Sequence, residues 1–140
     1  FITADYPAES RIIAMARDIN NYKSFWCAEK VKSTMLEFEM KNHRKPVVAM
    51  MGLAFKPNID DLRESPSKSI VGRVMMMCNN SDILIVEPNV SEHKQFKLTP
   101  YKEAYEQADI VVMLTAHDQF KTLPYDESKV ILDFCGIYKK

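Results

Sequence analysis

The sequence contains only three glycines in 140 residues, and their positions exclude a glycine-rich nucleotide loop. Gly52, Gly72 and Gly136 lie too far apart for the Gly-x-Gly-x-x-Gly pattern that opens a dinucleotide-binding βα unit. Glu87 follows Gly52 by 35 residues (87 − 52), beyond the roughly 20-residue spacing of a ribose-binding acid. We therefore expect no self-sufficient dinucleotide-binding domain and interpret Glu87 as a simple strand-end acid.

Cysteine and histidine are sparse as well, with three of each. The cysteines show no Cys-x-x-Cys spacing and are odd in number, at Cys27, Cys78 and Cys135. This spacing indicates neither a disulfide framework nor a zinc site, and it fits a reducing cytoplasm. The histidines are equally isolated, at His43, His93 and His117. We expect each to be a surface or a satisfied core residue rather than a metal ligand.

The sequence also lacks an excess of charge of either sign. Lysine plus arginine and aspartate plus glutamate both number 19, so the formal net charge is zero. This balance gives no electrostatic reason to expect nucleic acid or an anionic membrane as a partner. No apolar run approaches the roughly 20 residues that span a bilayer, and no signal peptide is visible. Because the chain begins at Phe1, we expect a fragment or an excised domain.

A long helix is predicted at the start of the chain, because neither glycine nor proline occurs between Ala8 and Lys41. Its length of about 30 residues corresponds to roughly 45–50 Å. Apolar residues recur along it and suggest a single stripe, formed by Ile12, Met15, Ile19, Tyr22, Trp26, Val31, Met35 and Phe38. Such a helix is longer than a small domain, so part of the stripe requires a partner. We expect a helix of the missing preceding part or a second subunit, and hence a homo-oligomer through this helix.

A basic, proline-ended break at 42–46 predicts a domain boundary. We assign residues 1–43 to the long helix and residues 44–140 to one domain. Strands and helices then alternate, with strands at 46–53, 83–86, 110–114 and 130–134 and helices at 67–78 and 100–107, the second capped by Thr99. This alternation is typical of an α/β fold with a Rossmann-like, doubly wound parallel sheet, here preceded by a long helix.

The most informative segment is 50–66, which contains the end of the first strand and the charged loop that follows it. It carries Lys56 and Arg63 and leads into a helix that Ser65 is expected to cap, with Pro66 in its first turn. In open α/β sheets, ligands bind at the carboxyl ends of the strands. A helix N-terminus with these two cations suits a phosphate, whereas a solvated charged turn is the alternative interpretation.

The amino-acid sequence of this segment, GLAFKPNIDDLRESP, closely resembles the signature of the nucleotide-sugar 6-dehydrogenases, the family of UDP-glucose and GDP-mannose dehydrogenases. The segments ILIVEPN at 83–89 and MLTAHDQF at 113–120 are similar to the branch that oxidises UDP-N-acetylmannosamine. The resemblance covers most of the chain, but only the last part of a family enzyme. It implies a C-terminal UDP-sugar-binding domain that a long helix joins to a central dimerisation region.

The resemblance also implies roles for individual residues. Phe55 and Lys56 match the pair that contacts the UDP-sugar, and Arg63 matches an arginine that reaches NAD. Asp60 and Asp61 are expected to shape the loop. NAD would be bound mainly by an absent N-terminal domain, and the catalytic cysteine would precede Phe1. The three cysteines of this chain are therefore not the nucleophile, no catalytic residue is assigned, and the isolated chain is expected to be inactive.

One departure concerns the stretch Asp133-Phe134-Cys135-Gly136, where the family branch usually carries a basic residue at the position of Cys135. Either Lys139 or Lys140 supplies that substrate contact, or the contact is lost. The resemblance implies UDP-N-acetylmannosaminuronic acid, made for surface polysaccharide, as the product. Two alternatives stay open: a UDP-glucose 6-dehydrogenase domain, and a Rossmann-like assembly module without a nucleotide role.

Overall fold

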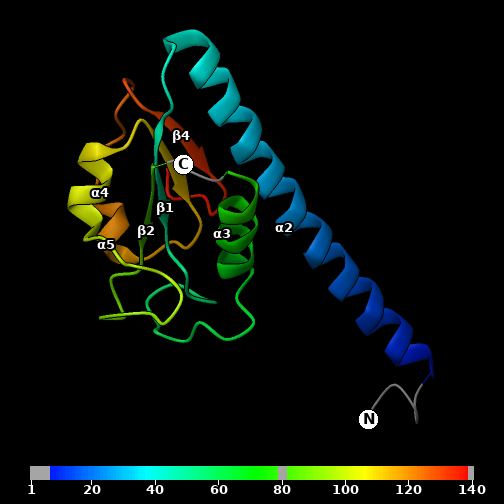
Figure 1. Cartoon of the computed structure of the whole chain (residues 1–140). Coiled ribbons are helices and arrows are strands. Elements are labelled where there is room, and N and C mark those ends of the chain that lie inside the picture. The colour runs from blue at the N-terminus through cyan, green and yellow to red at the C-terminus, as the bar shows by residue number, and fades with distance from the viewer. Residues whose placement is uncertain (1–6, 79–81, 139–140) are drawn as a thin grey trace.

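The structure is a computed structural model that describes residues 7–78 and 82–138, and it consists of a four-stranded parallel sheet with helices on both faces (Figure 1). The strands lie in the order β2-β1-β3-β4. Along the chain the elements are α2 (Pro7–Asn42), β1 (Val47–Met51), α3 (Pro66–Met77), β2 (Asp82–Val86), α4 (Tyr101–Gln107), β3 (Ile110–Met113), α5 (Asp118–Lys121) and β4 (Val130–Asp133). The predicted α/β fold, a doubly wound parallel sheet after a long helix, is confirmed.

The two central strands are buried because helices cover both faces of the sheet. β1 (VVAMM) and β3 (IVVM) have no polar residue, and all of β3 is buried. Val48 pairs with Ile83 on one side and with Ile110 on the other, so β1 lies between β2 and β3. Three of the predicted strands were one or two residues too long at an end, and the strand predicted at 83–86 began one residue late, a usual uncertainty of boundaries.

The sheet separates two apolar cores. One face packs against α2 and α3, and the other packs against α4 and α5. The chain crosses from β1 to β2 through α3 on the first face and from β2 to β3 through α4 on the second. The strand order therefore reverses between β1 and β3. The carboxyl ends of these two strands are the position at which doubly wound sheets bind ligands.

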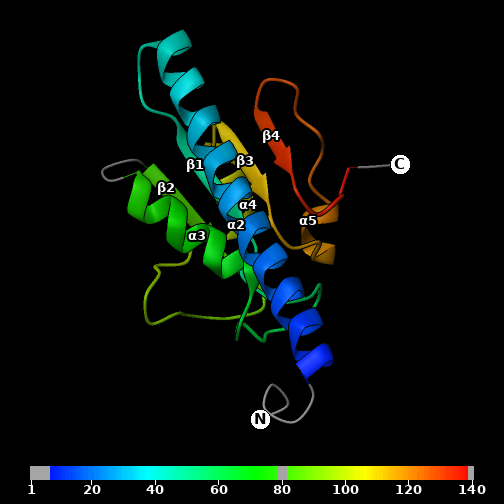
Figure 2. The same ribbon diagram turned by 90° about the vertical axis from the view of Figure 1, so that its right-hand side faces the viewer.

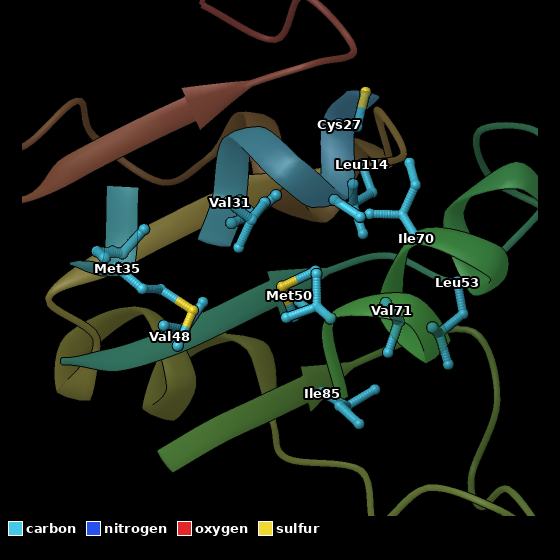
Figure 3. Close-up of a cluster of buried hydrophobic side chains, with 14 residues drawn as sticks. Cys27, Val31, Met35, Val48, Met50, Leu53, Ile70, Val71, Ile85 and Leu114 are labelled. Carbon is cyan, nitrogen blue, oxygen red and sulfur yellow. The ribbon is translucent and has the colours of Figure 1, made fainter. Parts of the chain in front are cut away.

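The helix α2 packs on the sheet through only the C-terminal part of the predicted stripe, Val31, Met35 and Phe38, together with residues that the stripe did not include. Its buried apolar residues are Cys27, Ala28, Val31 and Met35, which lie over Val48 and Met50 of β1 and over α3 (Figure 3). Met15, Tyr22 and Trp26 are exposed instead. The single predicted stripe was wrong because the step from Trp26 to Val31 is five residues, which moves the stripe to another face of the helix.

The N-terminal half of α2 extends beyond the sheet and α3 (Figures 1 and 2). Met15 and Tyr22 lie on this half, and Phe25 and Trp26 follow just past the middle of the helix. All four are exposed, with 69% of the surface of Tyr22 and 52% of that of Trp26 open to solvent. Ile12 and Ile19, which the predicted stripe included, lie outside the residues whose side chains are described. Residues 7–78 and 82–138 contain no helix that is long and apolar enough to cross a membrane.

Two helix caps show how local sequence sets the ends of the helices. Ser65 caps α3 as predicted: its hydroxyl accepts a hydrogen bond from the Lys68 N–H at 3.4 Å, and Pro66 is the first helical residue. The cap predicted for α4 was wrong, because Pro100 rather than Thr99 occupies the N-cap position. The Thr99 N–H instead donates to the carbonyl of Ile85 at 2.8 Å, which ties this residue to β2.

An ion pair joins the end of α2 to the start of β3. The guanidinium of Arg44 donates two hydrogen bonds of 2.8 Å to the carboxylate of Asp109. The Val47 N–H adds a bond of 2.9 Å to the same carboxylate. The bonds from Arg44 lower the pKa of Asp109 and outweigh burial, which would raise it. The charged form of Asp109 therefore stabilises the junction between the long helix and the sheet.

This pair predicts a loss of stability in acid. A depressed carboxyl pKa contributes stability above the unfolded pKa of about 3.9, and the contribution disappears as the pH falls through the lower folded value. We expect Asp109→Asn to lower the free energy of unfolding at about pH 6 and to matter less at about pH 3. Urea unfolding of both chains at the two pH values measures this difference, with the exposed Asp82→Asn as control. An equal loss at both pH values would contradict the prediction.

Candidate functional site

The candidate site is the loop at 52–65, which follows β1 and lies next to the loop after β2 at the carboxyl end of the sheet (Figures 1 and 2). The backbone turns at Gly52, whose φ of 106° favours glycine. A Cβ at this position would lie 2.7 Å from the Cβ of Thr115, which follows β3. The close approach of the two strand ends thus requires a glycine here.

Hydroxyl groups hold the start of this loop against α3 and the end of β3. The hydroxyl of Thr115 donates to the carbonyl of Ala54 at 3.1 Å and lies 3.1 Å from the hydroxyl of Ser67. Ser67 also donates to the carbonyl of Leu114 at 3.3 Å. Both hydroxyl-bearing residues are buried. The loop therefore leaves the sheet in one defined direction.

The carboxylate of Glu87 is buried at the end of β2 and accepts four hydrogen bonds. Its Oε1 accepts from the N–H groups of Leu53 and Ala54, at 2.9 and 3.0 Å, and from Nε2 of His117 at 3.0 Å. Its Oε2 accepts from the Asn89 N–H at 3.0 Å. Burial raises the pKa of Glu87, but the bonds from His117 and the backbone outweigh it and leave the pKa below its usual value. The acid is therefore an anchor for the loop rather than an exposed ligand.

His117 is the fully buried partner of Glu87. Its Nδ1 accepts a hydrogen bond from the Asn58 N–H at 2.9 Å and lies 3.3 Å from the side-chain nitrogen of Asn89. Since a backbone N–H cannot accept, the ring proton must be on Nε2, which faces the Glu87 carboxylate. His117 is a satisfied core histidine, one of the two roles that the sequence analysis predicted for it.

The structure brings Phe55 and Lys56 together on the exposed side of the loop. Half of the surface of Phe55 is exposed, and the ammonium of Lys56 lies 5.9 Å from the centre of its ring. The Phe55 N–H donates to the carbonyl of Asp61 at 2.9 Å, which fixes the backbone at this point. An exposed cation beside an aromatic face is a suitable arrangement for a phosphate next to an apolar group.

Arg63 lies on the returning arm of the loop, where it pairs with Asp61 and takes no part in the contact between Phe55 and Lys56. Its guanidinium is 88% exposed and donates to both carboxylate oxygens of Asp61 at 3.1 Å. Asp61 also accepts from the Arg63 N–H at 3.0 Å, so this acid shapes the loop as predicted. Arg63 lines an open hollow of about 610 Å³ whose lining mixes cations and acids, Lys68 and Lys94 with Asp60, Asp61 and Glu92. The surface pair with Asp61 is weak enough to exchange for another anion.

The carboxyl end of β4 is organised by Asp133. One of its oxygens accepts from the N–H of Gly136 at 2.8 Å and of Ile137 at 3.0 Å, and the other accepts from Tyr138 at 2.9 Å. Cys135, at the position where the sequence analysis expected a basic residue from the family resemblance, is half-buried. Burial and the nearby Asp133 raise its pKa to about 12, so the thiol is neutral at pH 7. Lys139 and Lys140 lie outside the described residues.

The other two cysteines also lack the properties of a nucleophile. Burial raises the pKa of Cys27, and burial likewise raises the pKa of Cys78. An activated thiol requires the opposite shift, because the thiolate is the reactive form.

Sequence reasoning did not find the buried network that supports the loop. Glu87 was interpreted as a simple strand-end acid, and His117 was assigned no partner. One signal was available: each residue follows the end of a neighbouring parallel strand, and such ends meet at the same edge of a sheet.

Comparison with known proteins identifies the class of protein. Residues 49–140, more than half of the chain, match the UDP binding domain of the UDP-glucose/GDP-mannose dehydrogenase family. The chain therefore belongs to this family, and these residues are its UDP binding domain. The resemblance seen in the loop at 50–66 is confirmed.

Two curated relatives show which kinds of enzyme the chain is similar to. UDP-N-acetyl-D-mannosamine dehydrogenase of Escherichia coli (strain K12) is 39% identical over 123 residues, which cover 81% of this chain and 29% of that enzyme. NDP-N-acetyl-D-galactosaminuronic acid dehydrogenase of Ralstonia solanacearum is 36% identical over 144 residues, 99% of this chain and 33% of that protein. The chain thus spans about a third of the length of these curated relatives.

A solved structure supports the fold. The UDP-N-acetyl-mannosamine dehydrogenase Cap5O from S. aureus matches with a TM-score of 0.71 at 22% identity, over 98% of this chain and 36% of that chain. At this level of identity the likeness concerns the fold alone.

Proposed function

We propose that this chain supplies the substrate-binding part of an NAD-dependent nucleotide-sugar 6-dehydrogenase that oxidises UDP-N-acetylmannosamine to the corresponding uronic acid. Residues 44–140 form the binding domain, and residues 1–43 connect it to a dimerisation region. The observation that carries the proposal is the family match over residues 49–140, together with the exposed pair Phe55–Lys56 at the carboxyl end of β1.

In this proposal Phe55 and Lys56 contact the UDP-sugar. Lys56 is exposed, and within residues 7–78 and 82–138 no carboxylate lies within ion-pair distance of it. Its ammonium is therefore available for a pyrophosphate oxygen, to which it would donate a charge-assisted hydrogen bond. Phe55 offers an apolar face directly beside that cation. The helix α3 adds its N-terminal dipole on the other side of the loop.

Arg63 is proposed to contact NAD when the binding domains close. NAD accepts a hydride from the substrate when it is bound. This chain has no glycine-rich loop to hold it, and the fit is limited to the exposed guanidinium of Arg63 beside a hollow of about 610 Å³. The residues present therefore suit one contact to a phosphate, and the main NAD site belongs to a different domain.

The remaining parts of the proposal concern the whole enzyme. The exposed Tyr22, Phe25 and Trp26 of α2 would form part of a homo-oligomer interface. The enzyme would act in the cytoplasm and supply the uronic acid for surface polysaccharide. These statements rest on the family assignment and on the apolar surface of α2.

We expect UDP to bind saturably to this chain in a calorimetric titration, with UMP and GDP as controls for the pyrophosphate and the base. Lys56→Ala should weaken UDP binding at least about tenfold, because a hydrogen bond to a charged group contributes roughly 1.5–3 kcal/mol. Lys102→Ala removes an exposed lysine from α4, which packs on the opposite face of the sheet from α3, and should leave the affinity unchanged. Equal binding of UDP by the Lys56 and Lys102 variants would contradict the assigned contact.

A second experiment separates the alternatives. A domain selective for UDP-N-acetylmannosamine should bind this sugar more tightly than UDP-glucose, whereas the reverse order would favour a UDP-glucose 6-dehydrogenase. A chain that binds none of these nucleotides, but associates through Trp26, would indicate an assembly module instead.

A further inference from the structure

A buried acid and a buried histidine underlie the loop that carries Phe55 and Lys56. The side chains of Glu87 and His117 are 0% exposed, and Oε1 of Glu87 lies 3.0 Å from Nε2 of His117. They cannot touch a ligand in solvent, so any effect on binding must pass through the residues that they contact. Those contacts are concentrated on the loop after β1.

The pair holds both ends of a short bridge. Glu87 binds the N–H groups of Leu53 and Ala54 before the bridge, and His117 binds the N–H of Asn58 after it. Between the two anchors lie only three residues, Phe55, Lys56 and Pro57. The bridge therefore cannot move as a whole unless a hydrogen bond to a buried group breaks. Breaking such a bond leaves an unsatisfied buried polar atom, which is costly.

The far anchor has further support at its exposed side. Asn58 adopts a φ of 63°, a left-handed conformation that asparagine tolerates better than most residues. Its side-chain oxygen accepts a hydrogen bond from the Asp118 N–H at 2.9 Å, at the start of α5. The loop after β1 is thus attached to the residues after β3 on both sides of His117.

The direction of the hydrogen bonds gives the network a single arrangement. The N–H of Asn58 must donate to Nδ1, so Nε2 carries the proton and donates to Glu87. Glu87 accepts at every contact. No member can exchange its role without leaving another one unpaired.

We propose that Glu87 and His117 are positioning residues, which set the backbone between Ala54 and Asn58 so that Phe55 and Lys56 present one geometry to the UDP part of the substrate. This inference rests on the proposed function, because it assumes that these two residues contact UDP. The histidine acts as a neutral link, and the acid is the common acceptor beneath it.

Two substitutions at position 117 separate the two ends of the link. In His117→Asn the side-chain oxygen lies close to the former Nδ1 and keeps an acceptor for the Asn58 N–H. In His117→Gln the amide nitrogen lies close to the former Nε2 and keeps a donor for Glu87, but the acceptor for Asn58 is lost. The exposed His43→Asn, at a φ of 57° that asparagine tolerates, is the matched control.

We expect His117→Gln to weaken UDP binding about fivefold by calorimetry, the range of one neutral hydrogen bond, and His117→Asn to stay within about twofold of the unchanged chain. The His43 control should bind normally. Unchanged affinity in His117→Gln would overturn the proposal. So would equal losses in the Gln and Asn variants, because these would reflect packing alone.

A double substitution tests whether the effect passes through the lysine. If His117 acts by placing Lys56, then Lys56→Ala with His117→Gln should bind UDP within about twofold of Lys56→Ala alone. Fully multiplied losses would mean independent effects and would overturn the proposal. Should His117→Gln not fold, Asn58→Gly tests the support of the same anchor, because it keeps the backbone N–H that binds His117 but removes the side-chain oxygen that binds the Asp118 N–H. At least a twofold loss of UDP affinity is expected, and unchanged affinity would count against the proposal.

Different measurements distinguish a failure of the proposed function from a failure of the anchoring. If the unchanged chain does not bind UDP, the proposed function fails, and the anchoring is judged by amide hydrogen exchange. Exchange at Asn58 should then accelerate in His117→Gln but not in His117→Asn. The ¹⁵N spectrum of the His117 ring should also show the tautomer with its proton on Nε2. Unaltered exchange, or a proton on Nδ1, would overturn the anchoring itself.

Discussion

Gly52→Ala should destabilise the domain by about 3 kcal/mol, as measured by urea unfolding. Two effects combine in this estimate. A φ of 106° is strained for any residue with a Cβ, and the added Cβ would lie 2.7 Å from the Cβ of Thr115 and 3.0 Å from its backbone nitrogen. The neighbouring atoms belong to the backbone and to its first side-chain carbon, so they cannot rotate away.

The same substitution at Gly72 is the control for this prediction. Gly72 lies inside α3, and a Cβ there would meet nothing within 4 Å. Alanine favours a helix interior over glycine, so Gly72→Ala should stabilise the chain by about 0.5–1 kcal/mol. A small effect at Gly52, similar to that at Gly72, would show that the two strand ends can separate. The loop after β1 would then be less constrained than its contacts suggest.

Met35→Ala should lower the free energy of unfolding by about 2–5 kcal/mol. Met35 is 5% exposed and packs with Val31 of α2 into the core over Val48 and Met50, so its loss would leave a cavity. Leu36 follows it directly but is 52% exposed, and Leu36→Ala should change stability by less than about 0.5 kcal/mol. Unfolding curves of the two variants at one protein concentration give the comparison.

This pair of variants distinguishes packing from assembly. If Met35 served mainly an oligomer interface, its substitution would change the molecular mass by light scattering and leave the stability of the monomer nearly intact. We expect the opposite result for Met35 and expect changes in association from Trp26→Ala. A similar loss of stability at positions 35 and 36 would contradict the docking of α2 on the sheet through the observed face.

Much of the fold followed from local patterns. The strands β1 and β3 are short apolar runs bounded by polar residues and proline, and α3 begins with a serine cap followed by proline. These patterns extend over only a few residues, so they predict the elements without knowledge of the rest of the molecule. The loop at 50–66 was likewise recognisable as a candidate site, because its charges lie between a buried strand and a helix start.

The face of α2 that packs on the sheet could not be predicted from the sequence in the same way. The helix has apolar residues on more than one side, including the buried Val31 and the exposed Trp26. Periodicity identifies a helix and its apolar positions, but it does not identify which face of the helix packs on the sheet. That depends on where the chain turns at the end of the helix, near Arg44, and on its pairing with Asp109.

The support of the candidate site was decided by the tertiary structure for a related reason. Glu87 and His117 are 30 residues apart in the sequence, and they come within 3.0 Å because they follow strands on either side of β1 in a parallel sheet. The sequence by itself determined the elements, the family and the residues proposed to contact UDP. Only the tertiary structure decided which buried groups hold those residues in place, since hydrogen bonds between distant strand ends exist only after the sheet has formed.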